Sequence, residues 1–256
     1  MLRWLSSCFK QKKCHDKTKH SYLVVPDLHG VHSIYKKVEK YIKHECEKSR
    51  TIIFLGDYMD RGESGTLDGI EFKDLGSYLI IKDLIKLQRW ATKNNRKIIF
   101  LRGNHEIFFE DYYLHDDQYA YSQYPFFKNS VDCLTYVFNK DEKFYKDFID
   151  FFSTLKPYYH DKTYNYLFIH AGIDPQEKDL EKQVKSGLVY WIRDQFLFSE
   201  KKLPYTVIFG HTPFSKPFMR ADKIGLDSGV YKRGFLNLLH IDNEDSRIIQ
   251  LFKKQA

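Results

Sequence analysis

The sequence predicts an α/β fold, and three observations support this prediction. Short apolar segments of the kind that form buried strands recur along the 256 residues. Segments with apolar residues at helical spacing separate the first three of them, which gives the order β-α-β-α-β. Hydrophobic residues make up 43% of the chain and aromatic residues 17%, which is enough to form a sizeable core.

The first part of the chain supplies three predicted strands and two predicted helices. The strands are SYLVV at 21–25, TIIFL at 51–55 and KIIFL at 97–101. Residues 31–48 and 75–90 each place apolar side chains on one helical face, as helices that cover a sheet do. This alternation predicts a layered structure.

The middle of the chain, residues 107–160, has a different character. Nine aromatic residues lie within 108–127, and 141–153 has apolar residues at helical spacing. We predict a mostly helical insertion that packs beside the sheet as a hydrophobic subdomain, and this subdomain could also form one wall of a cleft. After it, the predicted strands are 164–170, 205–211 and 223–227, and residues 234–252 are typical of a closing hairpin.

Residues 1–20 form a basic arm ahead of a predicted domain at 21–256. Six Lys and Arg against one Asp give the arm a charge of +5 within a total of +7. We interpret it as a solvated leader. The alternative is weak contact with a membrane surface through its apolar residues and Cys8. Nothing resembles a transmembrane segment or a nucleic-acid reader, so we expect no nucleic acid as partner.

The four cysteines are scattered and form no CxxC pair. This pattern predicts free thiols in a reducing compartment, and therefore a cytoplasmic protein.

Polar side chains follow five of the predicted strands. Because ligand sites of α/β sheets lie at the carboxyl edge of the strands, we expect these side chains to meet. They are Asp27 and His29, then Asp57, Asp60 and Arg61, then Arg102, Asn104 and His105, then His170, and finally His211. Carboxylate, imidazole and amide oxygen suit Mn²⁺, Fe²⁺ or Zn²⁺, and the absence of thiolate argues against structural zinc.

The number of candidate ligands is larger than one metal ion can use. We predict one ion at Asp27, His29 and Asp57. The second ion would use Asp57 again, together with Asn104, His170 and His211. Asp57 would bridge the two ions, and such two-metal centres serve in-line displacement at phosphorus.

Five motifs in order resemble the phosphoprotein phosphatase family of calcineurin-like metallophosphoesterases, of the bacterial serine/threonine type. They are DLHG at 27–30, GDYMDRG at 56–62, GNHE at 103–106, HAG at 170–172 and GHT at 210–212. WIR at 191–193 and LDSG at 226–229 are similar to its later motifs. The resemblance implies a central β-sandwich flanked by helices, with a dinuclear metal site, most often manganese, at the carboxyl edge of the strands.

The resemblance also implies roles. A hydroxide that bridges the metals attacks the phosphorus in line. His105 protonates the leaving alkoxide, Asp60 orients the His105 ring, and Arg61 and Arg193 bind the phosphate oxygens. A phosphorylated protein is the implied substrate. One departure is Pro26, which stands where the family has glycine; we expect the first metal site to survive this change.

Two other functions remain open at this stage. Dinucleoside tetraphosphate hydrolases have similar motifs, but their second motif typically lacks the aspartate that Asp60 supplies, and their third tends to end in aspartate, where this chain has Glu106. A catalytically silent binding module would be expected to lack a ligand or His105, and none is missing. We therefore favour a protein serine/threonine phosphatase, and the sequence leaves open whether it also accepts phosphotyrosine.

Overall fold

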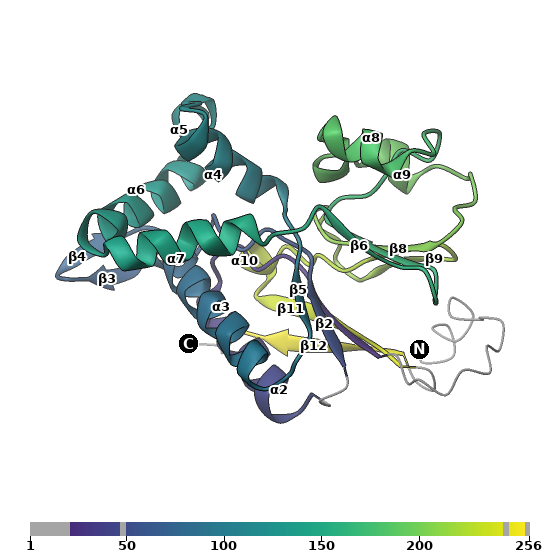
Figure 1. The fold of residues 1–256 in the computed structure, drawn as a ribbon, viewed down its shortest axis with the longest axis horizontal. Helices are drawn as coiled ribbons and strands as arrows, with labels where there is room; N and C mark the ends of the chain where they lie inside the picture. Colours follow the sequence, from purple (N-terminus) through teal and green to yellow (C-terminus); the bar gives the residue numbers. More distant parts are fainter. Residues whose placement is uncertain (1–20, 47–49, 243–245, 254–256) are drawn as a thin grey trace.

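Two five-stranded sheets form the centre of the molecule (Figure 1), in a computed structural model that describes residues 21–46, 50–242 and 246–253. The first sheet has the order β12-β11-β1-β2-β5, with β1, β2 and β5 parallel. Its strands are β1 (Tyr22–Val25), β2 (Thr51–Phe54), β5 (Ile98–Phe100), β11 (Phe235–Ile241) and β12 (Arg247–Phe252).

The second sheet has the order β6-β7-β8-β10-β9, and its three inner strands are parallel. Its strands are β6 (Tyr158–Asp161), β7 (Tyr166–Ile169), β8 (Thr206–Phe209), β9 (Phe218–Arg220) and β10 (Lys223–Gly225). A separate two-stranded hairpin consists of β3 (Gly65–Leu67) and β4 (Ile70–Phe72).

Helices cover the outer faces of the two sheets (Figure 1). Those packed on the side of the first sheet are α2 (His32–His44), α3 (Leu75–Lys93), α4 (Asn104–Leu114), α5 (Tyr119–Gln123), α6 (Pro125–Lys140) and α7 (Glu142–Ser153). The second sheet is covered by α8 (Leu180–Lys185), the 3₁₀ turn η2 (Leu188–Tyr190) and α9 (Asp194–Leu197). The short α10 (Val230–Arg233) precedes β11.

Alternation along β1 explains why its sequence is apolar throughout. Leu23 and Val25 face the helix-side core, whereas Tyr22 and Val24 face the core between the sheets. Successive residues of a strand point to opposite faces, and both faces are buried here. The predicted β-sandwich with flanking helices is therefore confirmed.

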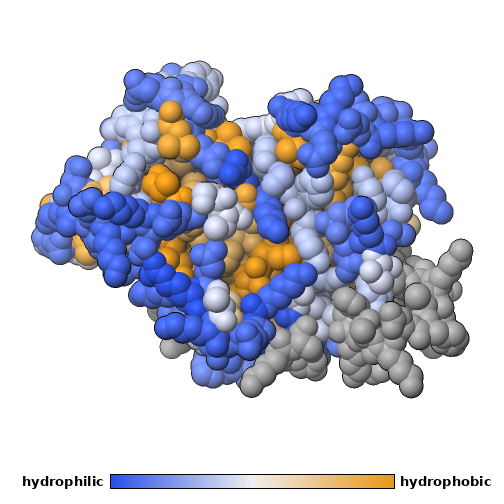
Figure 2. Space-filling view, in the orientation of Figure 1, coloured by the Kyte–Doolittle hydropathy of each residue, from blue (hydrophilic) through white to orange (hydrophobic). Residues whose placement is uncertain are grey.

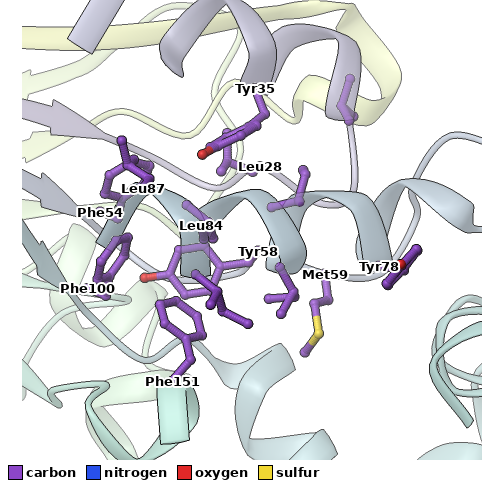
Figure 3. Close-up of a cluster of buried hydrophobic side chains, with 14 of the residues drawn as sticks. Leu28, Tyr35, Phe54, Tyr58, Met59, Tyr78, Leu84, Leu87, Phe100 and Phe151 are labelled. Atoms are coloured by element: carbon purple, nitrogen blue, oxygen red, sulfur yellow. The ribbon is translucent and has the colours of Figure 1, made fainter. Parts of the chain in front are cut away.

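The helix-side core also anchors the polar loop that follows β2 (Figure 3). Tyr58 and Met59 are fully buried in this core, and the hydroxyl of Tyr58 donates a hydrogen bond to the Leu101 carbonyl at 2.6 Å. These two side chains lie between Asp57 and Asp60 in the sequence. Packing of the apolar pair thus fixes the positions of both carboxylates.

Several elements differ from the sequence-based expectations. The helix expected over 31–48 ends at His44. The β3–β4 hairpin, the edge strands β6 and β9, and the short helices α8 to α10 were not predicted. The hairpin predicted over 234–252 is confirmed by the antiparallel pairing of β11 with β12.

The basic arm at 1–20 lies outside the described residues. The division of the chain at residue 20 and the limits 107–160 for the insertion therefore stay predictions. Among the residues that the structure describes, no helix has the length and apolar character needed to cross a membrane.

Candidate metal centre

The loops that follow the parallel strands of both sheets converge on one pocket of about 390 Å³. Figure 2 shows the surface hollowed between the part that carries α4 and α5 and the part that carries α8 and α9. Seven of the ten predicted site residues line the pocket: His29, Asp57, Arg61, Asn104, His105, Arg193 and His211. The other three, Asp27, Asp60 and His170, are completely buried next to it.

The backbone is strained at this site. Nine non-glycine residues in the described part of the chain have positive φ, and five of them are predicted site residues. These are His29, Asp57, Asp60, Arg61 and His211. Left-handed backbone is unfavourable for such side chains, so the surrounding packing must impose it, and strain of this kind is typical of functional sites.

Two glycines allow the backbone to approach the carboxylates closely. A Cβ on Gly103 would lie 2.1 Å from Oδ1 of Asp57, and one on Gly210 would lie 2.0 Å from Oδ1 of Asp27. Neither position can carry a side chain without displacing a carboxylate. This explains why GNHE and GHT begin with glycine.

Asp57 lies between two sets of metal-competent atoms. Its Oδ2 is 3.6 Å from Nε2 of His29 and 3.9 Å from Nε2 of His105. Its Oδ1 is 3.4 Å from Nε2 of His170, and His211 completes this second group. Each of the two groups could hold a metal ion, and the shared carboxylate could bridge them.

Asn104 belongs to the second group. Its Oδ1 lies 2.9 Å from Nε2 of His170 and 2.8 Å from Nδ1 of His211. Asp27 belongs to neither of the two groups around Asp57, although it was expected beside His29. One oxygen of Asp27 accepts a hydrogen bond from the backbone of His211 at 2.9 Å, and the other has no partner among the described residues.

The hydrogen bonds of the histidine Nδ1 atoms are consistent with a cation at Nε2. Nδ1 of His170 lies 2.9 Å from the Leu55 carbonyl, and Nδ1 of His29 lies 3.1 Å from the Met59 carbonyl. Each Nδ1 must therefore carry the proton, which leaves a lone pair on Nε2. The lone pair of His170 faces Oδ1 of Asn104 at 2.9 Å, and a cation between the two would be bound by both, whereas that of His29 lies 3.6 Å from Oδ2 of Asp57 and 3.2 Å from Nη1 of Arg61.

Electrostatics point to the same conclusion. Burial lowers the pKa of His170 to about 3, so its imidazole is neutral at physiological pH. Burial, followed by the charges of Asp227 and Asp57, raises the pKa of Asp27 well above its usual range. Burial and the charge of Glu106 do the same for Asp57. Buried carboxylates this close together require positive charge to remain ionised, and divalent cations supply it.

Glu106 has a structural role that the sequence did not reveal. Its Oε2 accepts hydrogen bonds from the backbone of Asp57 and Gly103, both at 2.8 Å, and its Oε1 accepts one from Tyr58 at 2.9 Å. The side chain is fully buried. Glu106 therefore links the loop after β2 to the start of α4. The sequence feature that could have indicated this role is its position as the fourth residue of the GNHE motif.

A second cluster adjoins the metal-competent groups. Nδ1 of His105 forms a short hydrogen bond with Oδ2 of Asp60, and Nε2 lies 2.8 Å from Nη1 of Arg61. The guanidinium of Arg61 also packs over the rings of Phe126, at 4.3 Å, and Tyr231, at 5.0 Å. Because arginine can only donate, Nε2 of His105 is the acceptor and Nδ1 carries the proton.

Aromatic rings form much of the remaining pocket wall. Phe108, Tyr124 and Phe126 come from the region of α4 to α6, and Trp191 and Tyr231 come from later segments. The rings of Phe108 and Trp191 are 5.2 Å apart, so the two sides of the pocket touch. From the sequence, the aromatic region 107–160 was considered as one wall of a cleft, but which of its aromatic residues line the pocket was not predicted.

Comparison with known proteins identifies the family. The family model for the calcineurin-like phosphoesterases matches residues 20–242. The chain belongs to the calcineurin-like phosphoesterase family. Membership makes it a hydrolase of phosphate esters, in a family that uses divalent metals, and the family prediction made from the motifs is confirmed. No curated protein matches the chain.

Solved structures share the phosphoesterase fold at low sequence identity. A cold-active protein-tyrosine phosphatase from a psychrophilic Shewanella has 17% identity and a TM-score of 0.59, over 91% of this chain and 78% of that one. A candidate diadenosine tetraphosphatase has 16% identity and a TM-score of 0.56, over 94% and 96%. A protein serine/threonine phosphatase from Saccharomyces cerevisiae has 15% identity and a TM-score of 0.56, over 94% and 82%. At these identities the likeness concerns the fold alone.

Proposed function

We propose that this phosphoesterase hydrolyses phosphomonoesters on serine and threonine side chains of proteins. The observation that carries the proposal is the short hydrogen bond between His105 and Asp60 at the first metal-competent group, to which His105 itself belongs. We assign His105 to proton transfer and Asp27 to the metal, because both ring nitrogens of His105 already have partners whereas Oδ1 of Asp27 has none among the described residues. A monoester of serine leaves as an alkoxide, which is a poor leaving group and needs a proton. His105 lines the pocket and is the candidate for supplying it.

The residues that would hold the metals are those predicted from the sequence. Asp27, His29 and Asp57 would bind one ion, and Asp57, Asn104, His170 and His211 would bind the other. The bound pair would neutralise phosphate charge and lower the pKa of a shared water toward roughly 7. Mn²⁺ is our first choice, with iron or zinc as alternatives, because the ligands are oxygen and imidazole nitrogen.

Arg61 and Arg193 would bind the phosphate oxygens. Both line the pocket, and arginine presents paired N–H groups that match phosphate geometry. The packing of Arg61 over the rings of Phe126 and Tyr231 limits the orientations of its guanidinium. When phosphate becomes the partner of this guanidinium, Nε2 of His105 is released from Arg61 and faces the leaving oxygen. Nε2 can then take a proton from water, Asp60 stabilises the resulting imidazolium, and transfer of that proton to the leaving oxygen returns the ring to its neutral form.

A second candidate is the hydrolysis of dinucleoside tetraphosphates. Two observations favour it: the aromatic pocket walls, on which nucleobases could stack, and the fold likeness to a candidate diadenosine tetraphosphatase. The Asp60–His105 pair favours the phosphomonoesterase, because a polyphosphate leaving group needs less protonation.

One experiment separates the two candidates. Purified protein with Mn²⁺ would be assayed for phosphate release from phosphoserine and phosphothreonine peptides and for cleavage of diadenosine tetraphosphate. We expect the peptides to be hydrolysed with the higher kcat/KM. Preference for the dinucleotide would overturn the proposal, and no turnover of either would favour a silent binding module. Phosphorylated protein as partner and a cytoplasmic location remain proposals as well.

A further inference from the structure

Asp60 has two carboxylate oxygens, and the His105 ring uses only one of them. Oδ2 is bonded to Nδ1 of His105, while Oδ1 accepts a short hydrogen bond from the hydroxyl of Ser130. Ser130 lies on α6, 70 residues further along the chain. A third contact holds the backbone of Asp60, whose N–H donates to Oγ of Ser77 at 2.8 Å.

The contact between Ser130 and Asp60 is completely shielded from water. Both residues have no exposed surface. The hydroxyl of Ser130 also lies 2.9 Å from the Phe127 carbonyl, the usual back-bond of a serine inside a helix. The hydroxyl has one proton, and a carboxylate is the stronger acceptor, so the proton goes to Asp60. Burial raises the pKa of Asp60 to about 7, and the Ser130 hydrogen bond acts against this rise.

We propose that Ser130 is a positioning residue that orients the Asp60 carboxylate and, through it, the imidazole ring of His105. This inference rests on the proposed function, in which His105 protonates the leaving group. Without the hydroxyl, Oδ1 of Asp60 would lose a side-chain partner in a dry environment, and the carboxylate could rotate about its Cβ–Cγ bond. The His105 ring would then be held less firmly toward the leaving oxygen.

This role predicts a dependence on the leaving group. An alkoxide that departs from a phosphoserine peptide needs protonation, whereas p-nitrophenolate departs without it. A residue that acts through His105 should therefore matter much more for the peptide than for p-nitrophenyl phosphate. A residue needed only for packing should affect both substrates equally.

The test compares Ser130→Ala and Ser130→Cys with wild type, with Mn²⁺ present. The thiol nearly conserves volume but donates weakly, so both variants test the hydrogen bond. We expect kcat on the phosphoserine peptide to fall about tenfold. The kcat on p-nitrophenyl phosphate should fall by a smaller factor, and KM should stay unchanged for both substrates. Ser130→Thr keeps the hydroxyl and should restore the peptide rate. Cys133→Ala, equally buried on the same helix, is the matched control and should change both substrates alike.

Two further measurements make the outcome decisive. In a His105→Ala background, Ser130→Ala should have almost no additional effect, since its route to the substrate is gone. Independently of turnover, the low-field NMR resonance of the His105 Nδ1 proton should be present in wild type and lost or shifted in Ser130→Ala. Equal losses on both substrates, or an unchanged resonance, would overturn the inference. If wild type hydrolyses neither phosphate ester, the proposed function fails while the resonance still tests Ser130.

Discussion

At the scale of single residues, Asp57 is the group on which both metal-competent sets depend. Its two oxygens face different histidines, so one substitution disturbs both sets at once. We expect Asp57→Asn to lower the bound metal from two ions to less than one and to reduce kcat by about a hundredfold or more. Elemental analysis of the purified variant and a phosphopeptide assay measure these effects.

The control for this variant is Asp68→Asn. Asp68 is a half-exposed aspartate that pairs with Lys140 on the surface, so the same change of charge there should leave metal content and rate unaltered. Full metal occupancy in Asp57→Asn would contradict the assignment of Asp57 as the shared ligand.

Trp191 tests whether the aromatic wall contacts the substrate. Its side chain is 44% exposed, and its ring lies 5.2 Å from Phe108 and 6.3 Å from His211. Because it touches no predicted catalytic group except a metal ligand, Trp191→Ala should raise KM for a phosphopeptide several-fold and change kcat little. Steady-state kinetics on a phosphoserine peptide provide the measurement.

Phe198→Ala is the matched control for Trp191→Ala. Phe198 is 64% exposed and does not belong to the pocket lining, so its loss should leave KM unchanged. The same KM for wild type and Trp191→Ala would mean that the substrate does not reach this wall.

At the scale of elements, Glu63 links the loop after β2 to the start of α2. That helix has no side-chain cap of its own. Oε2 of Glu63 accepts a hydrogen bond from the Ser33 backbone at 2.8 Å, and Oε1 accepts from the Ser33 hydroxyl at 2.6 Å and from Nζ of Lys253 at 2.7 Å. A carboxylate from a distant loop thus stabilises the positive end of the helix.

This contact predicts a pH dependence of stability. Burial alone would raise the pKa of Glu63, but hydrogen bonds from Lys253 and Ser33 lower it below its ordinary value of 4.5. A lowered pKa in the folded state means that the contribution is present above pH 4.5 and is lost as pH falls through the folded value. Glu63→Gln should therefore cost about 0.5–1 kcal/mol of unfolding free energy at pH 7 and less at lower pH.

Urea unfolding of the metal-free protein at pH 7 and pH 4 measures this difference. The control is Glu142→Gln, since Glu142 is 80% exposed and, within the described part of the chain, its ion pair is with Lys146 on the same helix. A constant difference between wild type and Glu63→Gln at both pH values would show that ionisation of Glu63 contributes nothing.

The elements also show why some structure was predictable and some was not. Strands such as β1 and β2 are apolar throughout because both faces are buried, and this leaves a clear pattern. β6 has the sequence YYHD and is largely half-buried, so it carries no such pattern. The motif residues follow predictable strands, whereas Ser130 reaches the site only through the packing of α6, which local sequence cannot reveal.

At the scale of the whole molecule, the proposed ligands come from both sheets. Asp27, His29, Asp57 and Asn104 follow strands of the first sheet, and His170 and His211 follow β7 and β8 of the second. Bound metal would therefore join the two halves of the sandwich. Burial raises the pKa of Asp27 and Asp57, so a cation at this junction would stabilise the ionised carboxylates that bind it.

Metal binding should consequently raise the thermal stability of the whole molecule. A ligand that binds only the folded state adds about 2.7 kcal/mol when it is present at a hundred times its Kd. We expect Mn²⁺ to raise the Tm of chelator-treated protein by several degrees, whereas Mg²⁺, which binds imidazole poorly, should raise it less. Scanning calorimetry of wild type and Asp57→Asn measures this shift. A variant that lacks the shared ligand should show almost no response to Mn²⁺, and an equal shift in both proteins would place the stabilising ion elsewhere.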